Sequence, residues 1–359
     1  MGSNGPSPIG DERVDAVERR TFIVGAAALP SIASIDGLDS IAPTDPPGRV
    51  GPTEIAQVRD AAVAVKRGDM RWGGGFGFDA ALVETRRARD LLDARCPAHL
   101  RRELFVAVGW LAANTGFMAF DLERFRDASR LWTVASACAN EAEDWSLQAR
   151  VLGCMARQST WLGHPTEALS LVDRALDGAK SRLVPTELAM LWALRARAVA
   201  RTGDDAATGQ AVARADQWFA ARALDESVER PWIGHYGHPH HWGDTGMAWA
   251  DVAVASGGDN VHAAMEAGGR HQAAADGHGP DASRSQALSL VALAELDTRV
   301  GDLDRAVRTG NLALDAAERV NSHRVRSGLV SLQEATERHG ARNDVAELRD
   351  RIAAALVAA

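Results

Sequence analysis

The residues best suited to chemistry lie between Trp232 and Asp244. This stretch holds four histidines within seven positions: His235, His238, His240 and His241. Neutral imidazole is a common metal ligand, so these side chains could bind zinc or a similar ion. Their spacing matches neither an HExxH helix nor a cysteine-pair motif, and a segment rich in Gly and Pro offers no evident partners to orient the rings.

We therefore predict a His/Gly/Pro-rich loop at 228–244, inserted between helices, whose Trp and Tyr side chains pack over the body of the protein. Asp244 is expected to cap the helix that follows. A metal-binding protein or metalloenzyme that uses the four histidines is the alternative. The leading interpretation requires no metal and no other cofactor.

A second candidate is Gly73-Gly74-Gly75-Phe76-Gly77, which has the glycine content of a phosphate-binding loop. Such a loop needs a preceding strand and, in the P-loop case, a Gly-Lys-Ser/Thr ending, and the sequence has neither. A flexible turn between the first two helices is the preferred interpretation. No nucleophile, base and acid can be grouped from the sequence, so we assign no catalytic residue and expect no enzyme.

Composition excludes several classes of protein. The 359 residues include 48 acidic and 40 basic side chains, giving a net charge of −8, which argues against a broad nucleic-acid-binding surface. The three cysteines (Cys96, Cys138 and Cys154) cannot form a disulfide framework, which indicates a reducing compartment. No apolar run reaches the roughly 18 residues of a membrane span. We expect a cytoplasmic protein that binds no membrane.

The N-terminal residues 1–52 are rich in Gly, Pro and Ser and predict an extended or disordered arm. Arg19 and Arg20 stand before the short apolar run 22–29, as in a twin-arginine export signal. The preceding stretch nevertheless has four acidic and three basic side chains, whereas a secretory leader is positively charged. An apolar arm docked on the body is the preferred interpretation, with an exported binding protein as the alternative.

Helical periodicity dominates the chain from residue 53 onward, and no alternating strand pattern persists. It predicts seven helix pairs: 53–66 with 79–95, 99–119 with 124–142, 145–162 with 165–180, 185–202 with 206–222, 245–256 with 260–276, 282–300 with 303–319, and 322–338 with 343–357.

The turns inside the pairs share one design. Gly163, Gly203 and Gly301 each end a helix where a left-handed residue is often needed, and a capping or first-turn residue such as Asp302 follows. A small alanine comes next, where the two helices must approach closely. Ala128 lies 40 residues before Ala168, which matches the 40 residues between Gly163 and Gly203.

This pattern resembles the tetratricopeptide repeat, with a period nearer 40 than 34. The resemblance implies an all-α fold over 53–357, an α-solenoid of about seven antiparallel helix pairs in which each pair is stabilised by stacking on its neighbours. It also implies a concave groove lined by the first helix of each pair.

Arginines fall at the groove positions that this resemblance implies, and clustered guanidinium groups suit carboxylate or phosphate groups. Phe117 and Trp161 could stack on an apolar part of the ligand, and Asn114 occupies a position where such repeats often hold a peptide. The predicted ligand-binding residues are Asn114, Phe117, Arg150, Arg157, Trp161, Arg197, Arg201, Glu295 and Arg299. The alternative is that these arginines simply pair with acidic residues on neighbouring helices.

Several segments resemble the C-terminal half of actinobacterial Xre-type regulators, in which a helix-turn-helix DNA-binding head precedes tetratricopeptide-like helices. The segments are Val17-Glu18-Arg19-Arg20-Thr21-Phe22-Ile23, Val50-Gly51-Pro52 before Val58-Arg59, Asp69-Met70-Arg71-Trp72-Gly73-Gly74-Gly75, Thr115-Gly116-Phe117-Met118-Ala119-Phe120-Asp121 and Met155-Ala156-Arg157-Gln158. Only 18 residues precede the twin arginines, too few for such a head. Either the body acts without a head or the gene start has been placed too late.

The resemblance implies a role in transcriptional or developmental regulation. Together with the groove, it predicts a non-enzymatic sensor that binds a peptide, a protein segment or a small anionic ligand. We expect no direct DNA binding by this chain, and a homodimer is an alternative assembly.

Overall fold

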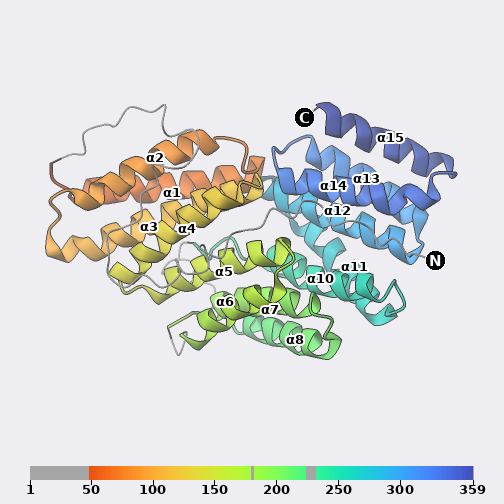
Figure 1. Cartoon of the computed structure of the whole chain (residues 1–359), viewed down its shortest axis with the longest axis horizontal. Helices are drawn as coiled ribbons and strands as arrows, with labels where there is room; N and C mark the ends of the chain where they lie inside the picture. The colour runs from red at the N-terminus through yellow and green to blue at the C-terminus, as the bar shows by residue number, and fades with distance from the viewer. Residues whose placement is uncertain (1–47, 179–181, 224–231, 359) are drawn as a thin grey trace, which may run out of the picture.

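The computed structural model describes residues 48–178, 182–223 and 232–358. Over these residues the protein is all-α, with 14 α-helices packed in sequential antiparallel pairs, an arrangement consistent with a helical repeat (Figure 1). The predicted helix pairs are therefore confirmed. The predicted arm (1–52), its twin arginines included, falls outside the described residues except for 48–52.

The α-helices are α1 (Pro52–Trp72), α2 (Phe78–Asp90), α3 (Ala98–Asp121), α4 (Phe125–Glu141), α5 (Trp145–Trp161), α6 (Pro165–Asp177), α7 (Pro185–Ala200), α8 (Asp205–Ala220), α10 (His238–Ala255), α11 (Val261–Gly277), α12 (Ser283–Val300), α13 (Leu303–Ala317), α14 (His323–Thr336) and α15 (Asn343–Ala358). Short 3₁₀ turns follow α2 (Leu91–Asp93), precede α12 (Pro280–Ala282) and follow α14 (Glu337–His339).

The turn glycines have the backbone conformation that the sequence predicts. Gly163, Gly203 and Gly301 have φ values of 79°, 84° and 87°, in the left-handed region that glycine enters without steric cost. The side chain of Asp302 then accepts a hydrogen bond from the backbone of Arg305, which caps the start of α13. Turn chemistry of this kind explains why the helices end where they do.

Close approach at the start of each second helix depends on one small buried residue. Ala128 and Ala168 are fully buried, and Ala306 is buried too, as predicted. After Gly203 the prediction is wrong by one or two positions, because Ala206 is exposed and Thr208 occupies the buried site. Thr208 tolerates that site because its hydroxyl donates a hydrogen bond to the carbonyl of Asp204.

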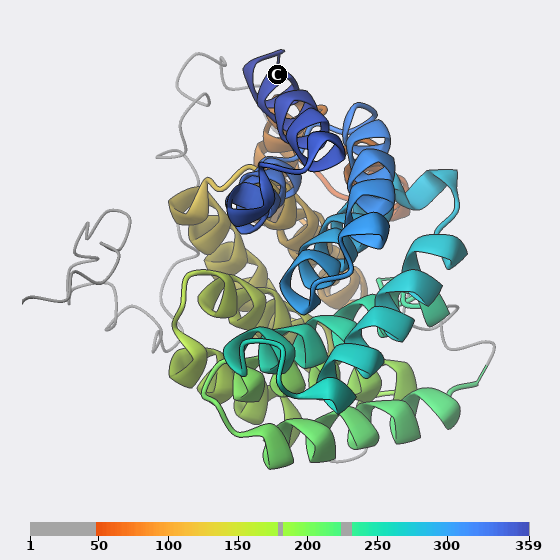
Figure 2. The same ribbon diagram turned by 90° about the vertical axis from the view of Figure 1, so that its right-hand side faces the viewer.

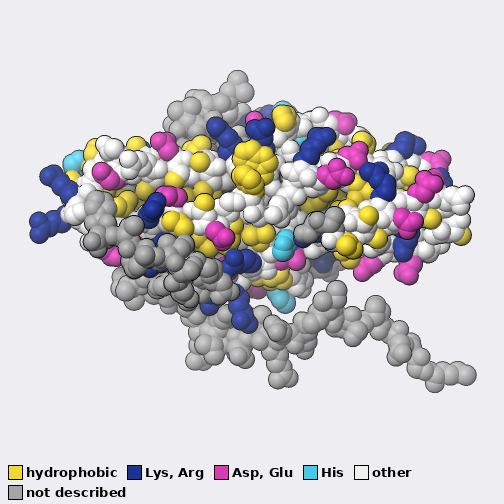
Figure 3. Space-filling view, turned by 90° about the horizontal axis from the view of Figure 1, so that it is seen from above, with side chains coloured by type: hydrophobic (Ala, Val, Ile, Leu, Met, Phe, Trp, Pro, Cys, Tyr) yellow, Lys and Arg dark blue, Asp and Glu magenta, His cyan; other side chains and the backbone are white. Residues whose placement is uncertain are grey.

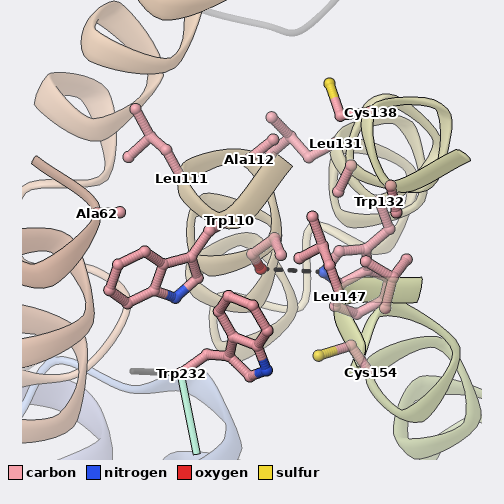
Figure 4. Packing of buried hydrophobic residues seen from close by; sticks show 14 of the residues in the cluster. Ala62, Trp110, Leu111, Ala112, Leu131, Trp132, Cys138, Leu147, Cys154 and Trp232 are labelled. Carbon is pink, nitrogen blue, oxygen red and sulfur yellow. Dashed lines mark hydrogen bonds between the residues drawn. The ribbon is translucent and has the colours of Figure 1, made fainter. Parts of the chain in front are cut away.

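Helix α3 is the centre of the first core cluster. Its apolar residues continue around the whole helix, which makes it long and apolar enough to cross a membrane by length and composition. However, 83% of that apolar stretch is buried inside the protein, so α3 is a core helix. Trp132 of α4 is fully buried against it and donates from Nε1 to the carbonyl of Ala113 at 3.2 Å (Figure 4).

The helix at the His-rich segment begins earlier than predicted. Helix α10 begins at His238, with Pro239 in its first turn, so residues 238–244 are helical and Asp244 lies inside the helix instead of capping it. The sequence prediction failed because the Gly and Pro residues of this segment were taken as signs of a loop. A proline is nevertheless well tolerated in the first turn of a helix. The predicted burial of aromatic side chains is confirmed for Trp232 and Tyr236.

The two halves of the helical array meet. Helix α12 packs on α1, and the turn before α14 lies against the end of α3, although more than 200 residues separate these segments (Figures 1 and 2). The glycine turn after α1 takes part in this contact, because Gly75 donates to the carbonyl of Asn321 and Asn321 donates to that of Trp72. The motif does form the turn between the first two helices, as predicted, and its backbone is also hydrogen-bonded to Asn321.

Close packing explains the glycines of that turn. A Cβ on Gly74 would lie 2.4 Å from the carbonyl oxygen of Met118, a distance that real side chains do not reach. The Gly74 amide instead donates to the carboxylate of Asp121 at 2.8 Å. The sequence motif that could suggest a phosphate site thus serves to close the array around a central space.

Candidate functional site: a cationic cavity

The first helices of the pairs surround a cavity of about 160 Å³ that opens to the solvent. Helices α1, α3, α5, α7, α10, α12 and α14 all contribute side chains to its wall, and α11, the second helix of its pair, adds His271. Because these helices are not neighbours in sequence, the cavity exists only when the array is folded. A volume of this size is comparable to that of cavities that hold one small aromatic molecule.

The wall has two kinds of side chain. Its cations are Lys66, Arg150, Arg157, Arg197, Arg284 and Arg324, and Asp244 is the sole carboxylate among the described lining residues. Its apolar side chains include Met70, Phe117, Trp161, Met190, Leu194, Met247 and Leu288. A wall of this composition suits a molecule with an anionic group and an apolar body.

Two of the arginines form ion pairs with carboxylates that do not line the cavity. Arg284 of α12 forms a buried ion pair with Asp69 of α1, and Arg324 of α14 pairs with Asp121 at 2.8 Å. Asp121 has no exposed surface, and burial alone would raise its pKa, but Arg284 and Arg324 lower the pKa below its ordinary value. These pairs join the two halves of the array.

Two more arginines pair across the cavity wall. Arg157 of α5 makes two hydrogen bonds of 2.8 Å to the carboxylate of Asp244 in α10. Burial would raise the pKa of Asp244, but Arg157 lowers it. Arg197 of α7 pairs with Asp251 at 3.3 Å, and that carboxylate is shared with Arg201. The alternative that groove arginines pair with acidic side chains of neighbouring helices is thus confirmed for these residues.

Lys66 and Arg150 are different. Neither forms an ion pair with any carboxylate of the described residues. Arg150 is 5% exposed, donates to the side-chain oxygen of Asn114 at 3.1 Å, and leaves its Nε without a described partner. Burial and the charge of Arg150 together lower the pKa of Lys66 to about 7. The cavity therefore carries positive charge that no ion pair within the described residues balances.

Four histidines complete the wall: His235, His240, His271 and His278. Burial lowers the pKa of His240 to about 3 and those of His271 and His278 to about 4, with nearby cations adding to the effect at His240 and His271. These imidazoles are neutral at pH 7 and each presents one donor and one acceptor nitrogen. They add polarity to the cavity without adding charge.

The four clustered histidines of the sequence do not converge. His235 and His240 face the cavity, whereas His241 is buried outside it with Nε2 2.7 Å from a carboxylate oxygen of Asp216. His238 lies on the surface near Arg222. Within the described residues, no group of three or more His, Cys, Asp or Glu side chains could hold a metal ion. The first turn of α10 separates these side chains because it sends successive residues to different sides.

Five of the predicted ligand-binding residues lie together in the cavity wall: Phe117, Arg150, Arg157, Trp161 and Arg197. Asn114 lies behind Arg150, where its amide donates to the carbonyl of Ala62 at 2.9 Å. Arg201 lies outside the wall and is bound to Asp251. Glu295 and Arg299 pair with each other at 2.7 Å on α12, away from the cavity. The repeat positions thus include side chains of α3, α5 and α7 that line the cavity, but also Arg201 at the end of α7 and two residues of α12 that do not.

Sequence reasoning missed Lys66, Arg284, Arg324 and His271. One signal was available for Lys66, which is one of only two lysines in a chain with 40 basic side chains. No such compositional signal points to Arg284 or Arg324. They line the cavity only because α12 packs on α1 and α14 lies against α3, and the local sequence does not indicate these contacts.

The outer surface contrasts with the cavity. In the face that Figure 3 shows, dark blue and magenta side chains are interspersed over the described residues. Several surface arginines pair with acidic neighbours, such as Arg351 with Asp315 at 3.0 Å. Within the described residues, Arg150 differs from these surface arginines because it is buried and has no carboxylate partner.

Comparison of the chain with models of protein families and with curated proteins found no match.

Proposed function

We propose that this protein is a tetratricopeptide-like α-solenoid that acts as a non-enzymatic sensor for a small anionic ligand. The turn glycines, the buried small residues near helix starts and the cavity lined by first helices support the repeat assignment. The resemblance to the C-terminal half of Xre-type regulators supports a role in transcriptional or developmental regulation, through a protein partner and without direct DNA contact.

The observation that carries the proposal is the unpaired charge of Lys66 and Arg150 inside a cavity with an apolar wall. Burying a cation without a partner is costly, so such residues are rarely present for stability. An anion bound between them would supply the missing partner. The small volume favours a small molecule over an extended peptide, although a peptide's terminal carboxylate would have the same chemistry.

Ligand binding can act on the whole array because of where the cavity lies. Lys66 belongs to α1 and Arg150 to α5, while Arg284 and Arg324 extend from α12 and α14. A ligand that contacts side chains of α1 and α5 as well as side chains of α12 and α14 would favour the arrangement in which these helices lie together over any more open one. The surface presented to a partner would then depend on ligand occupancy.

A matched pair of probes tests the proposal. 3-Phenylpropionate carries a carboxylate and one ring, and 3-phenylpropionamide has nearly the same shape without the charge. We expect the wild-type protein to bind the acid at least about tenfold more tightly in isothermal titration calorimetry, because hydrogen bonds to charged groups are the stronger ones.

The double variant Lys66→Met/Arg150→Met should lose this preference and keep its helical circular dichroism. Arg299→Ala, which removes a cation outside the cavity, is the matched control and should bind as the wild type does. Equal binding of acid and amide by the wild type would refute an anion site without reference to any variant.

A further inference from the structure

The two ends of the cavity differ in chemistry. Arg150 and Arg157 are seven residues apart on α5, which places them about 10 Å apart along the helix axis. The charge of Arg150 acts on Lys66 and His235 at one end, and the charge of Arg197 acts on His271. Asp244, which is bound to Arg157, interacts electrostatically with His240, on which Lys66 also acts, and with Arg197.

His271 is the distinctive residue of the second end. It has no exposed surface and lines the cavity, yet neither ring nitrogen has a hydrogen-bond partner among the described residues. Its ring packs beside α10, where a Cβ on Gly246 would lie 3.3 Å from Cε1 and from Nε2. Buried polar groups are nearly always hydrogen-bonded, so a histidine whose two nitrogens are unpaired among the described residues is a candidate to bind a ligand.

The ion pair of Arg157 with Asp244 and the apolar side chains of the wall offer a ligand few free hydrogen-bonding groups. Arg157 and Asp244 satisfy each other through two hydrogen bonds. Met190, Leu194 and Met247 supply apolar surface. A ring or short hydrocarbon body fits there better than a second polar group.

We propose that the ligand is a small aromatic carboxylate with a hydroxyl group at the far end of its ring. The carboxylate lies between Lys66 and Arg150, the ring lies against the apolar wall, and the hydroxyl bonds to His271. This inference rests on the proposed function. It adds that the ligand has a hydroxyl group opposite its carboxylate, and that His271 recognises this hydroxyl. His271 is thus a specificity-determining residue.

The chemistry of the two partners agrees. A neutral imidazole offers either an acceptor nitrogen to a phenol hydroxyl or a donor N–H to its oxygen, so one hydroxyl would pair with one of the two ring nitrogens. A ligand without the hydroxyl would bind through its carboxylate alone and leave His271 unpaired. The alternative is that ordered water satisfies His271, in which case a hydroxyl on the ligand brings little gain.

The test compares 3-phenylpropionate with its 3-hydroxyphenyl and 4-hydroxyphenyl analogues by isothermal titration calorimetry on the full chain. We expect at least one hydroxylated analogue to bind about three- to tenfold more tightly to the wild type, the range of one neutral hydrogen bond. In His271→Phe this preference should fall to about twofold or less, while 3-phenylpropionate keeps its affinity.

Two controls separate the explanations. His271→Gln, whose amide both donates and accepts, should retain part of the preference if His271→Phe proves unstable. Arg150→Met should weaken all three acids alike and leave their ratio unchanged.

Equal affinities of all three acids for the wild type, or a preference that survives in His271→Phe, would overturn the role of His271 and leave the anion site intact. If none of the three acids binds, the anion site itself fails, and this inference fails with it.

Discussion

Arg284 and Arg150 are buried arginines in the wall of the same cavity, yet their surroundings differ. Arg284 pairs with Asp69 and lies 3.8 Å from Asp121, so its charge is balanced by the helices behind it. Arg150 has an amide oxygen of Asn114 as its partner and the ammonium of Lys66 nearby. The first arginine joins the two halves of the array, and the second has no carboxylate partner among the described residues.

The comparison shows that arginine content alone says little about binding. Five arginines line the cavity, and four of them are already paired with Asp69, Asp121, Asp244 or Asp251. Replacing a paired arginine changes stability as well as binding, whereas replacing an unpaired one mainly removes a ligand contact. The variants below separate these two classes.

The largest effect is expected for Asp121→Asn. This carboxylate accepts hydrogen bonds from the Gly74 amide, the Ser322 hydroxyl and Arg324, all buried. Removing its charge leaves Arg324 in the interior without a counter-ion, and we expect a loss of about 3–5 kcal/mol in the free energy of unfolding. Urea denaturation measures it.

Asp173→Asn is the matched control for Asp121→Asn. Asp173 pairs with Arg195 at 2.8 Å, but its side chain is 46% exposed. The free energy of unfolding of Asp173→Asn should fall by less than about 1 kcal/mol. Similar losses for the two variants would mean that the closing cluster contributes no more than a surface pair.

Asp244→Asn should convert a paired arginine into an unpaired one. Arg157 would keep its place but lose its carboxylate, at an expected cost of about 1–3 kcal/mol in stability. Binding of 3-phenylpropionate should become tighter, because the cavity would hold one more unbalanced cation. Weaker binding would show that the Arg157–Asp244 pair shapes the site and that its charge does not matter.

Lys66 makes the stability depend on pH. Its pKa is about 7 in the folded protein and about 10.4 when unfolded, so between these values the unfolded chain binds more protons. This group therefore adds stability as the pH rises from 7 to 10, by at most about 1.4 kcal/mol per pH unit. That contribution is lost again as the pH falls through 7.

The variant Lys66→Met isolates this effect. We expect it to be more stable than the wild type at pH 6, with the difference shrinking as the pH approaches 10, as followed by urea denaturation across the range. A difference that does not change with pH would mean that the folded Lys66 has an ordinary pKa. Anion affinity should also fall above pH 7 in the wild type, because the free ammonium is lost.

The smallest effect is expected for Arg201→Ala. This arginine shares Asp251 with Arg197, but its side chain is 44% exposed while that of Arg197 is 16% exposed. We expect a loss of less than about 1 kcal/mol in stability and no change in binding of 3-phenylpropionate. A clear loss of binding would mean that Arg201 belongs to the ligand-binding site, as its repeat position predicted.

Residues could be predicted where their interactions lie within a few positions along the chain, and could not where the partners are far apart in sequence. The turns at Gly163, Gly203 and Gly301 were found because each depends on a backbone conformation that a few adjacent residues decide. Helix periodicity placed Arg150, Arg157 and Arg197 on the inner face, where they line the same cavity, because positions along one helix determine which side chains share a face. Both kinds of inference need only local periodicity.

The failures have the opposite cause. The glycine turn after α1 looked unconstrained because its partner, Asn321, is nearly 250 residues away. Arg299 was assigned to the groove by its repeat position, but it pairs with Glu295 on its own helix. The segment 228–244 was predicted to be a loop, whereas α10 begins within it at His238.

The sequence by itself determined the all-helical pairs, their turns and the face on which the central arginines lie, because helix periodicity and turn chemistry act within about 20 residues. Only the tertiary structure decided which cations are balanced. Asp69 reaches Arg284 and Asp121 reaches Arg324 across more than 200 residues, and no carboxylate within the described residues reaches Arg150 or Lys66 in the same way. Charge compensation depends on distance in space, which local sequence does not encode.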